Sequence, residues 1–262
     1  MKVTILGAGA FGSALGKIVE YNGHEVTFYD PIKYPSISLD SAVSSPEAII
    51  YVAPSDQHAD LLPYLPQDTP LICASKGFLS LTPFNKFTNF SALGGAAFAK
   101  DIENSKKNLR LTASSSLSER LFSTEKITVE YTADTLGILL CGALKNIYAI
   151  GAGLFGDSEN AEAVSMPYLE SVISEMQSIL KVNGSSSEVL KLSCGAPDLL
   201  LSCSPDSRNF RFGLSLKNHT KSNDATVEGL SVIKSLNEYP EFTIPNSATI
   251  LKDIINIIEK EV

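Results

Sequence analysis

The amino-acid sequence predicts an α/β domain with a mainly parallel β-sheet over residues 1–133, followed by an all-α domain over residues 134–262. In the first part, short apolar runs that end at Gly, Pro or Ser alternate with helical patterns, which is typical of βαβ units. From Asp134 onward, apolar residues recur at helical spacing and no run favours a strand. With 262 residues and 44% hydrophobic residues, the chain is long enough to bury two such cores.

The first predicted strand, Val3–Leu6, leads into the loop Gly7-Ala8-Gly9-Ala10-Phe11-Gly12 and then into a helical pattern. In this strand–loop–helix context, a Gly-x-Gly-x-x-Gly loop predicts a dinucleotide site. Gly7 permits a tight turn, Gly9 lets backbone N–H groups approach a pyrophosphate, and Gly12 lets the helix pack closely on the strand. The sequence therefore favours a nucleotide-binding unit over a βαβ unit that binds no nucleotide.

The second predicted strand, residues 25–29, ends at Asp30, about 20 residues past the loop. An acidic side chain at this place accepts hydrogen bonds from the adenosine ribose and repels a 2′-phosphate. The helix that follows the glycine loop directs its positive dipole end toward the phosphates. We therefore expect NAD in preference to NADP. Lys33 and Lys2 lie near enough in sequence to reduce that preference, so NADP is an alternative cofactor.

Two further predicted strands end in turns that we expect at the cofactor. The remaining strands are predicted over residues 48–53, 71–74, 91–95, 109–113 and 127–129, with a helix over 56–65 and a broken segment over 31–45. Because the carboxyl ends of parallel strands face the cofactor crevice, Pro54 is expected near the cofactor and Lys76, in Ser75-Lys76-Gly77, at a ligand. An exposed loop lysine is the alternative interpretation of Lys76. The small residues of the 94–99 turn allow a ligand to approach closely.

The run from Leu136 to Ile150 is apolar on nearly every side of a helix, so this helix is expected to be buried. Lys145 is the exception within it, because a lysine is almost never fully buried without a partner. Cys141 and Gly142, one turn earlier, are small and leave room beside the amine. Lys145 is therefore either a structural lysine that reaches solvent or a catalytic amine that lines a cavity. Other helices are predicted over 161–181, 186–193, 227–238 and 246–260.

A polar cluster follows in the second domain. Asp198 comes after a Gly-Pro turn and before an apolar segment, which suits a fixed carboxylate at a cavity wall. Arg208 offers a rigid fork of donors that matches phosphate oxygens, and Ser207 and Asn209 add neutral donors on either side of it. An arginine on an exposed loop is the alternative explanation.

Composition excludes several classes of protein. The formal net charge of -8 argues against a general nucleic-acid binder, although a small anion could bind where cations are concentrated. The sequence contains no secretory leader and no apolar run of about 18 residues, so we expect a cytoplasmic protein without stable membrane insertion. No metal site is predicted, because the cysteines show no paired ligand spacing and the histidines, His24, His58 and His219, are scattered. The cysteines lie among apolar or small residues, so we expect free buried thiols: Cys73, Cys141, Cys194 and Cys203.

Six motifs occur in the order seen in the NAD(P)-dependent glycerol-3-phosphate dehydrogenase family, and the chain resembles that family over nearly its whole length. The motifs are Gly-x-Gly-x-x-Gly at 7–12, Ser-Lys-Gly at 75–77, Gly-Ala-Leu-Lys-Asn at 142–146, Gly-x-x-Asp-Leu-Leu at 195–200, Ser-Arg-Asn at 207–209 and Val-Glu-Gly at 227–229. The resemblance implies a Rossmann-type domain followed by an all-α domain like the C-terminal domain of 6-phosphogluconate dehydrogenase. It also implies reversible hydride transfer between NAD(P)H and dihydroxyacetone phosphate, which gives glycerol 3-phosphate for phospholipid synthesis. A homodimer is compatible with it.

The resemblance also implies roles for particular residues. Lys145 looks like the catalytic acid/base, with Lys76 and Asp198 beside it. Substrate contacts are implied for Lys76, Gly95, Ala97, Lys145, Asp198, Ser207, Arg208 and Asn209. Cofactor contacts are implied for Gly7, Gly9, Ala10, Phe11, Gly12, Asp30, Pro54, Lys76, Ala99, Arg208 and Glu228.

The chain departs from the family pattern at several positions. The family's Gly-Pro-Ser-Phe-Ala-x-Glu loop is Gly95-Ala96-Ala97-Phe98-Ala99-Lys100-Asp101 here, so a substrate contact at Ala97 can use only the backbone. Leu139 stands where the family commonly has a glutamate. The Thr-Arg-Gly that family members often carry is absent, with Ser165-Met166-Pro167 nearby, and the 31–47 segment is shorter than in the family. Two alternatives remain open. One is a related two-domain reductase such as a ketopantoate reductase, and the other is an NAD- and phosphate-binding sensor with weak catalysis.

Overall fold

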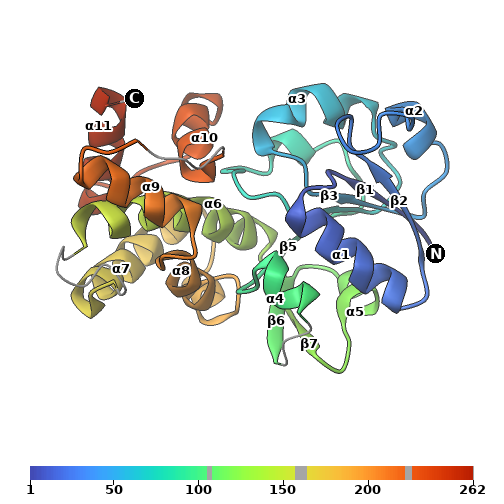
Figure 1. Ribbon diagram of the computed structural model, residues 1–262, viewed down its shortest axis with the longest axis horizontal. Helices are drawn as coiled ribbons and strands as arrows, with labels where there is room; N and C mark the ends of the chain where they lie inside the picture. The colour runs from blue at the N-terminus through green and yellow to red at the C-terminus, as the bar shows by residue number, and fades with distance from the viewer. Residues whose placement is uncertain (105–107, 157–163, 222–225, 262) are drawn as a thin grey trace. The chain divides into compact units, whose positions relative to one another are not determined.

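The computed structural model describes residues 1–104, 108–156, 164–221 and 226–261, which are arranged in two compact units (Figure 1). One unit consists of Met1–Lys76 and Leu81–Ile138. The other consists of Gly77–Ser80 and Leu139–Val262. The first contains a β-sheet with helices and the second is helical in the residues described, as the sequence predicts.

The first unit is built on a seven-stranded sheet with the order β2-β1-β3-β4-β5-β6-β7. The strands are β1 (Lys2–Leu6), β2 (Glu25–Tyr29), β3 (Ala48–Tyr51), β4 (Leu71–Cys73), β5 (Phe90–Gly94), β6 (Leu109–Ala113) and β7 (Ile127–Tyr131). All neighbouring strands pair in parallel except β5 and β6, which are antiparallel. The mainly parallel sheet is therefore confirmed. The carboxyl ends of β1 to β5 share one edge, and those of β6 and β7 lie at the opposite edge.

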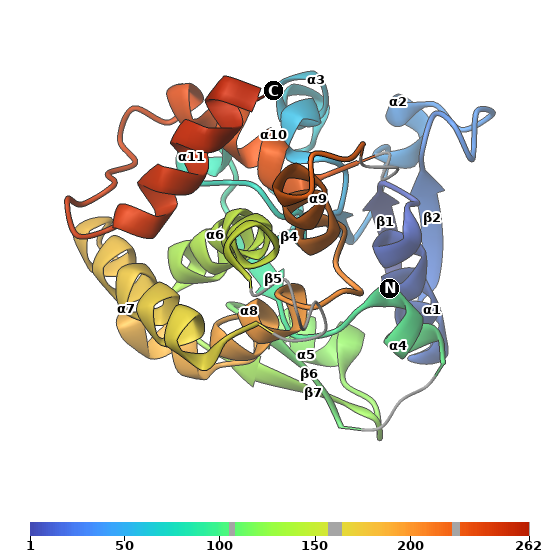
Figure 2. The same cartoon turned by 60° about the vertical axis from the view of Figure 1, so that its left-hand side comes forward.

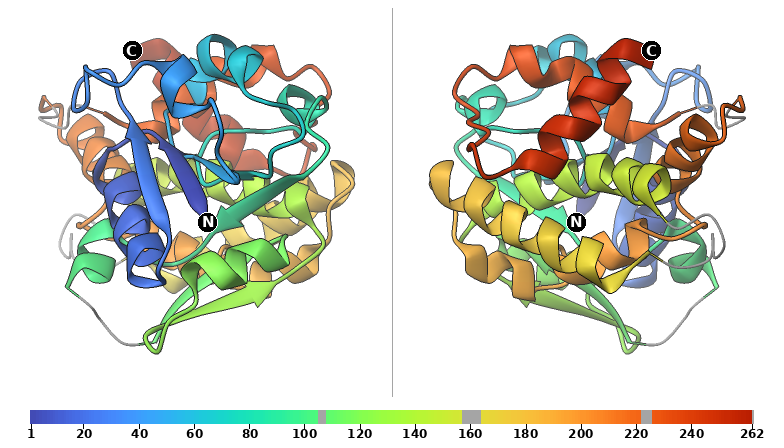
Figure 3. Two further views of the ribbon diagram at one scale, coloured as in Figure 1. Left: turned by 90° about the vertical axis from the view of Figure 1, so that its right-hand side faces the viewer. Right: turned by 90° about the vertical axis from the view of Figure 1, so that its left-hand side faces the viewer.

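Helices α1 (Ala10–Tyr21), α4 (Ala99–Glu103) and α5 (Ser116–Phe122) share one apolar core with the sheet (Figure 3). Because strand side chains alternate between faces, Val3 and Ile5 enter this core while Thr4 points the other way. The Thr4 hydroxyl donates to the carbonyl of Ala42, at the end of α2 (Leu39–Ala42), at 2.6 Å. This bond anchors α2 on the second face.

Some predicted elements of this unit were wrong in extent. The helix predicted over 56–65 is split into 3-10 turns at Ser55–Gln57 and Leu62–Tyr64 around α3 (His58–Leu61). Pro63 lies in the first turn of the second 3-10 segment, where it cannot donate a backbone hydrogen bond to continue α3. Strand β7 runs two residues beyond its predicted end at Val129.

The second unit surrounds α6 (Thr135–Phe155), the helix that contains Lys145 (Figure 2). The others are α7 (Met166–Val182), α8 (Ala196–Ser202), α9 (Arg208–Lys217), α10 (Glu228–Ser235) and α11 (Thr249–Glu261). Helix α6 is long and apolar enough to cross a membrane, but 83% of its most apolar window is buried inside the protein. It is therefore the core helix that its composition predicts.

A buried carboxylate joins three of these helices. Glu175 of α7 accepts a hydrogen bond from the Tyr148 hydroxyl of α6 at 2.9 Å. It also accepts the backbone N–H groups of Ile250 at 2.7 Å and Leu251 at 3.1 Å, at the start of α11. Figures 2 and 3 show α7 and α11 beside α6. Burial first, and the Glu175 carboxylate second, raise the pKa of Tyr148 well above its usual value.

The helical boundaries differ from the predicted ones in this unit. Helix α7 begins at Met166, and residues 161–163 of its predicted range lie outside the described residues. The helix predicted over 186–193 is a 3-10 segment, Ser187–Lys191. Helices α8 and α9 lie in segments for which the sequence predicts no helix.

Candidate functional site

The glycine loop has the geometry that a dinucleotide requires. Gly7 has a φ of +103°, and a Cβ there would lie 2.7 Å from the backbone nitrogen of Ala53. A Cβ at Gly12 would lie 2.0 Å from the Gly7 oxygen, so α1 can follow β1 this closely only with glycine. A Cβ at Gly9 would meet nothing within 4 Å. Gly9 is the N-cap of α1 and provides no side-chain acceptor, so the N–H groups in the first turn of α1 are left uncapped by a side chain.

Asp30, at the end of β2, is held by backbone donors. Its Oδ2 atom accepts the N–H of Ala8 at 2.9 Å, and its Oδ1 atom accepts the N–H groups of Ile32 and Lys33 at 3.0 Å each. Partial burial alone would raise the pKa of Asp30, but these hydrogen bonds and the Lys33 charge hold it below its usual value. Asp30 therefore ties the glycine loop to the turn that follows β2.

Lys76 and Phe11 meet at the same edge of the sheet. The Lys76 Nζ atom lies 5.1 Å from the centre of the Phe11 ring, in the first turn of α1, which is within the range of a cation–π contact. Pro54 is exposed after β3, and its carbonyl accepts a hydrogen bond from the Tyr51 hydroxyl at 3.2 Å. The first unit thus places a cation and an aromatic ring beside the glycine loop.

The 95–101 loop is tightly built around Gly95, whose φ is +147°. A Cβ at Gly95 would lie 2.6 Å from the carbonyl oxygen of Arg110. Ala97 is only 3% exposed, its methyl group belongs to the apolar core, and its N–H donates to the Gly95 carbonyl at 2.9 Å. The Ala97 side chain therefore packs in the core. Ala99, the first residue of α4, is partly buried against the same core.

In the second unit, Lys145 forms a buried hydrogen-bonded ion pair with Asp198. Lys145 is 3% exposed and Asp198 is 2% exposed. Asp198 lies in the first turn of α8, which also contains Pro197 at a position where a missing N–H does no harm. Cys203, which follows the last residue of α8, is near enough to interact electrostatically with Lys145, and burial raises the pKa of its thiol to about 12. Lys145 is thus held in the core by a carboxylate instead of reaching solvent.

A buried amide network lies beside this pair. The Asn209 side-chain nitrogen donates to the Asn146 Oδ1 atom at 3.0 Å, and the Asn209 Oδ1 atom accepts the Gly229 N–H at 2.9 Å. Asn146 also donates to the carbonyl of Gly142 at 3.1 Å. The sequence predicts no role for Asn146, although this residue follows Lys145 in the Gly-Ala-Leu-Lys-Asn motif. The signal that could have found it is a second polar residue in an otherwise apolar helix.

Arg208 is the first residue of α9 and is half-exposed. Its guanidinium group donates to the Glu228 carboxylate at 2.6 Å and to the Thr226 hydroxyl at 2.7 Å. Ser207 caps α9, since its hydroxyl accepts the N–H of Phe210. The structure therefore brings Lys145, Asp198, Ser207, Arg208, Asn209 and Glu228 together in one unit.

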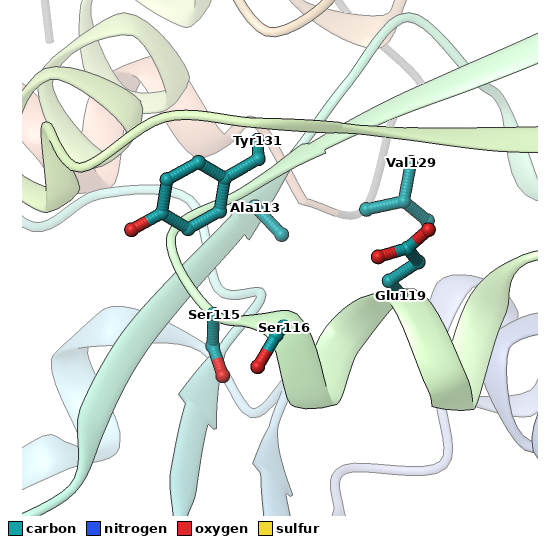
Figure 4. A pocket seen from close by; sticks show the side chains of 6 residues that line it. All are labelled: Ala113, Ser115, Ser116, Glu119, Val129 and Tyr131. Carbon is teal, nitrogen blue, oxygen red and sulfur yellow. The ribbon is translucent and has the colours of Figure 1, made fainter.

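A cavity of about 290 Å³ lies elsewhere in the first unit (Figure 4). It is lined by Ala113, Ser115, Ser116, Glu119, Val129 and Tyr131. These residues come from β6, α5, β7 and the turn between β6 and α5, so the cavity lies at the edge opposite the glycine loop. None of the predicted site residues lines it, and it contributes no cation. We therefore do not assign the predicted ligands to it.

The chain is similar to known dehydrogenases in sequence and in fold. The chain is 28% identical over 265 residues to the glycerol-3-phosphate dehydrogenase [NAD(P)+] of Agrobacterium fabrum, with 82% of this chain and 79% of the relative covered. The fold is similar to a crystal structure of glycerol-3-phosphate dehydrogenase from Coxiella burnetii, with a TM-score of 0.82, 22% identity and 100% and 95% of the two chains covered. A ketopantoate reductase from Ralstonia eutropha is less similar, with a TM-score of 0.57, 16% identity and 99% of both chains covered.

Two family models match separate parts of the sequence. The model of the NAD-dependent glycerol-3-phosphate dehydrogenase N-terminus matches residues 2–35, which contain the glycine loop and Asp30. The model of the C-terminus of the same enzyme matches residues 134–262, which contain Lys145, Asp198 and Arg208. Because these ranges together cover more than half of the sequence, the chain belongs to the NAD-dependent glycerol-3-phosphate dehydrogenase family.

Proposed function

We propose that this chain catalyses reversible hydride transfer between NAD(P)H and dihydroxyacetone phosphate, giving glycerol 3-phosphate that serves phospholipid synthesis. It is an oxidoreductase that takes a small phosphorylated substrate. The observation that carries the proposal is the buried Lys145–Asp198 ion pair, within a sequence that matches the C-terminal family model. Residues 1–133 are proposed as the cofactor domain and residues 134–262 as the substrate domain.

Lys145 is proposed as the acid/base of the reaction. As the carbonyl carbon is reduced, negative charge grows on its oxygen, and an ammonium group beside that oxygen stabilises the charge and supplies a proton. The Asp198 carboxylate orients the amine through their hydrogen bond. The Asn146–Asn209 network joins α6, α9 and α10 by hydrogen bonds. The helix segment that carries Lys145 is therefore held in a fixed position.

Arg208 is proposed to bind the substrate phosphate, with Ser207 and Asn209 beside it. A guanidinium group has five N–H donors, and the hydrogen bonds to Glu228 and Thr226 leave others for a phosphate. Binding a phosphate that does not react supplies energy for positioning the carbonyl. In the other unit, Lys76, Gly95 and Ala97 are proposed as further substrate contacts.

The glycine loop fits a nicotinamide dinucleotide, because Gly9 faces open space and the start of α1 carries no side-chain cap. When bound, this cofactor supplies the hydride from C4 of its nicotinamide ring. Gly7 to Gly12 would hold the pyrophosphate by backbone N–H groups, and Asp30 would lie at the adenosine ribose. Pro54, Lys76, Ala99, Arg208 and Glu228 are proposed as the remaining cofactor contacts.

We also propose a cytoplasmic enzyme that forms a homodimer. The four cysteines are free and buried, which suits a reducing compartment. Size-exclusion chromatography with light scattering measures the assembly, and a monomer at working concentrations would contradict the dimer.

The decisive experiment follows NADH absorbance with dihydroxyacetone phosphate. Lys145→Ala should lower kcat by about 10²–10⁴-fold, because proton transfer in the transition state contributes that much. Its NADH affinity, measured by fluorescence titration, should be unchanged. Lys234→Ala removes an exposed lysine of α10 and serves as the matched control. Absence of turnover by the wild-type chain, with intact NADH binding, would favour the sensor over the enzyme.

A further inference from the structure

We infer that Lys33 decides whether this chain accepts the 2′-phosphate of NADPH, while Asp30 is a positioning residue that fixes the glycine loop. This inference rests on the proposed use of a nicotinamide dinucleotide. It changes the role expected of Asp30, whose charge was expected from the sequence to exclude NADPH.

The first step concerns the lone pairs of Asp30. A carboxylate excludes a 2′-phosphate most strongly when it faces the ribose with free acceptors and uncompensated charge. Here Oδ1 accepts two backbone N–H groups, from Ile32 and Lys33, and Oδ2 accepts a third from Ala8. Oδ1 has no further acceptor position, and Oδ2 retains one. Asp30 can therefore accept one ribose hydroxyl, and three donors compensate its charge.

The second step concerns the turn that follows Asp30. The Tyr34 N–H donates to the Asp30 carbonyl at 2.8 Å, and the Tyr34 ring stacks on Phe28 of β2, with ring centres 5.5 Å apart and planes 8° from parallel. These contacts fix the 30–34 turn against the strand. Lys33 is exposed on this turn, and its backbone N–H is 3.0 Å from the Asp30 carboxylate. The backbone of Lys33 is thus fixed next to the proposed ribose position, and its charge is near enough to help lower the pKa of Asp30.

The third step excludes the other lysine. Lys2 is the first residue of β1, so it lies at the opposite end of that strand from Gly7. Its side chain is exposed there, away from the loop. Of the two lysines expected to influence the cofactor, only Lys33 stands at the binding edge. A phosphate monoester on the ribose would therefore meet the Lys33 ammonium beside a compensated carboxylate, and both NADH and NADPH would be accepted.

Binding titrations followed by cofactor fluorescence test the assignment without any need for turnover. Lys33→Gln should raise the Kd for NADPH about 5-fold at low salt and leave the Kd for NADH within about 2-fold, because exposed charge pairs contribute up to about that factor. Lys33→Glu should weaken NADPH further. High salt should reduce the difference, since exposed charges are screened. Lys2→Gln, the matched control, should bind both cofactors like the wild type.

Asp30→Asn supplies a second arm. An amide has one acceptor oxygen, so it can accept the N–H of Ala8 or those of Ile32 and Lys33 but not both. The tie between the glycine loop and the turn is therefore lost, and both cofactors should bind more weakly by similar factors. Tighter NADPH binding by this variant would show that Asp30 acts as a charge barrier and would overturn the inference. An equal change for both cofactors in Lys33→Gln would overturn it as well. Failure of the wild-type chain to bind either cofactor would overturn the proposed function together with this inference.

Discussion

At the scale of single residues, Lys145 shows how burial and chemistry are connected. Two opposite charges that are each about 3% exposed lose nearly all of their hydration, and their mutual hydrogen bond compensates part of that loss. Replacing such a pair by apolar residues is often neutral for stability, so stability alone does not explain its presence. A charge kept inside an apolar helix is most simply explained by a reaction that needs it.

Arg208 permits a test of the phosphate contact at the same scale. Arg208→Ala should weaken dihydroxyacetone phosphate about 10- to 100-fold, because hydrogen bonds to charged groups contribute about 1.5–3 kcal/mol. An unphosphorylated ketone should be affected much less, and kcat/KM for the two substrates measures the difference. Arg211→Ala, one turn along α9, is the matched control, since Arg211 donates to the Pro205 carbonyl at 2.8 Å. An equal loss for both ketones would show that Arg208 supports the fold and does not recognise phosphate.

At the scale of elements, glycines decide how closely helices approach one another. A Cβ at Gly213 of α9 would lie 1.9 Å from the Ile150 carbonyl oxygen of α6, and one at Gly229 of α10 would lie 2.8 Å from the Asn146 carbonyl oxygen. Both helices therefore pack directly on the backbone of α6. This close packing brings Asn209 within hydrogen-bond distance of Asn146.

Two glycines of the nucleotide loop separate binding from folding. Gly9→Ala should leave Tm unchanged, because its Cβ would meet nothing within 4 Å and its φ of -60° suits any residue. It should nevertheless weaken NADH, since the methyl group would occupy the space proposed for the pyrophosphate. Gly12→Ala should lower Tm by several degrees, because its Cβ would lie 2.0 Å from the Gly7 oxygen. Thermal unfolding and NADH titration of both variants check this, and a fall in Tm for Gly9→Ala would contradict it.

The parts of the fold that were predictable from the sequence are those with a local signal. Strands β1 to β7 are apolar runs that end in turns, so their bounds could be predicted within two residues. Helices α8 and α9 were missed, although Pro197 in the first turn and Ser207 as the cap are typical helix starts. The Asn146–Asn209 bond joins residues 63 apart, and no local pattern announces such a contact.

At the scale of the whole molecule, the net charge of the protein has the same sign as the charges of its proposed ligands. The chain has a formal net charge of -8, yet the proposed substrate and cofactor are anions. Local cations and backbone donors must therefore provide the attraction, and they are concentrated at few places: Lys33, Lys76 and the start of α1 in one unit, and Lys145 and Arg208 in the other. Away from these places the negative charge should repel nucleic acids.

The buried thiols give the whole molecule an alkaline limit of stability. Burial raises the pKa of Cys73 and of Cys203 from 9.0 to about 12 in the folded protein. A raised folded-state pKa stabilises the fold fully below the unfolded value, and this contribution is lost as the pH rises toward the folded value. The free energy of unfolding, measured in urea, should therefore fall by a few kcal/mol between pH 9 and pH 12. Cys73→Ala should be less stable at pH 7 but lose less stability over that range. A variant with the same alkaline dependence as the wild type would show that the Cys73 thiol does not set this limit.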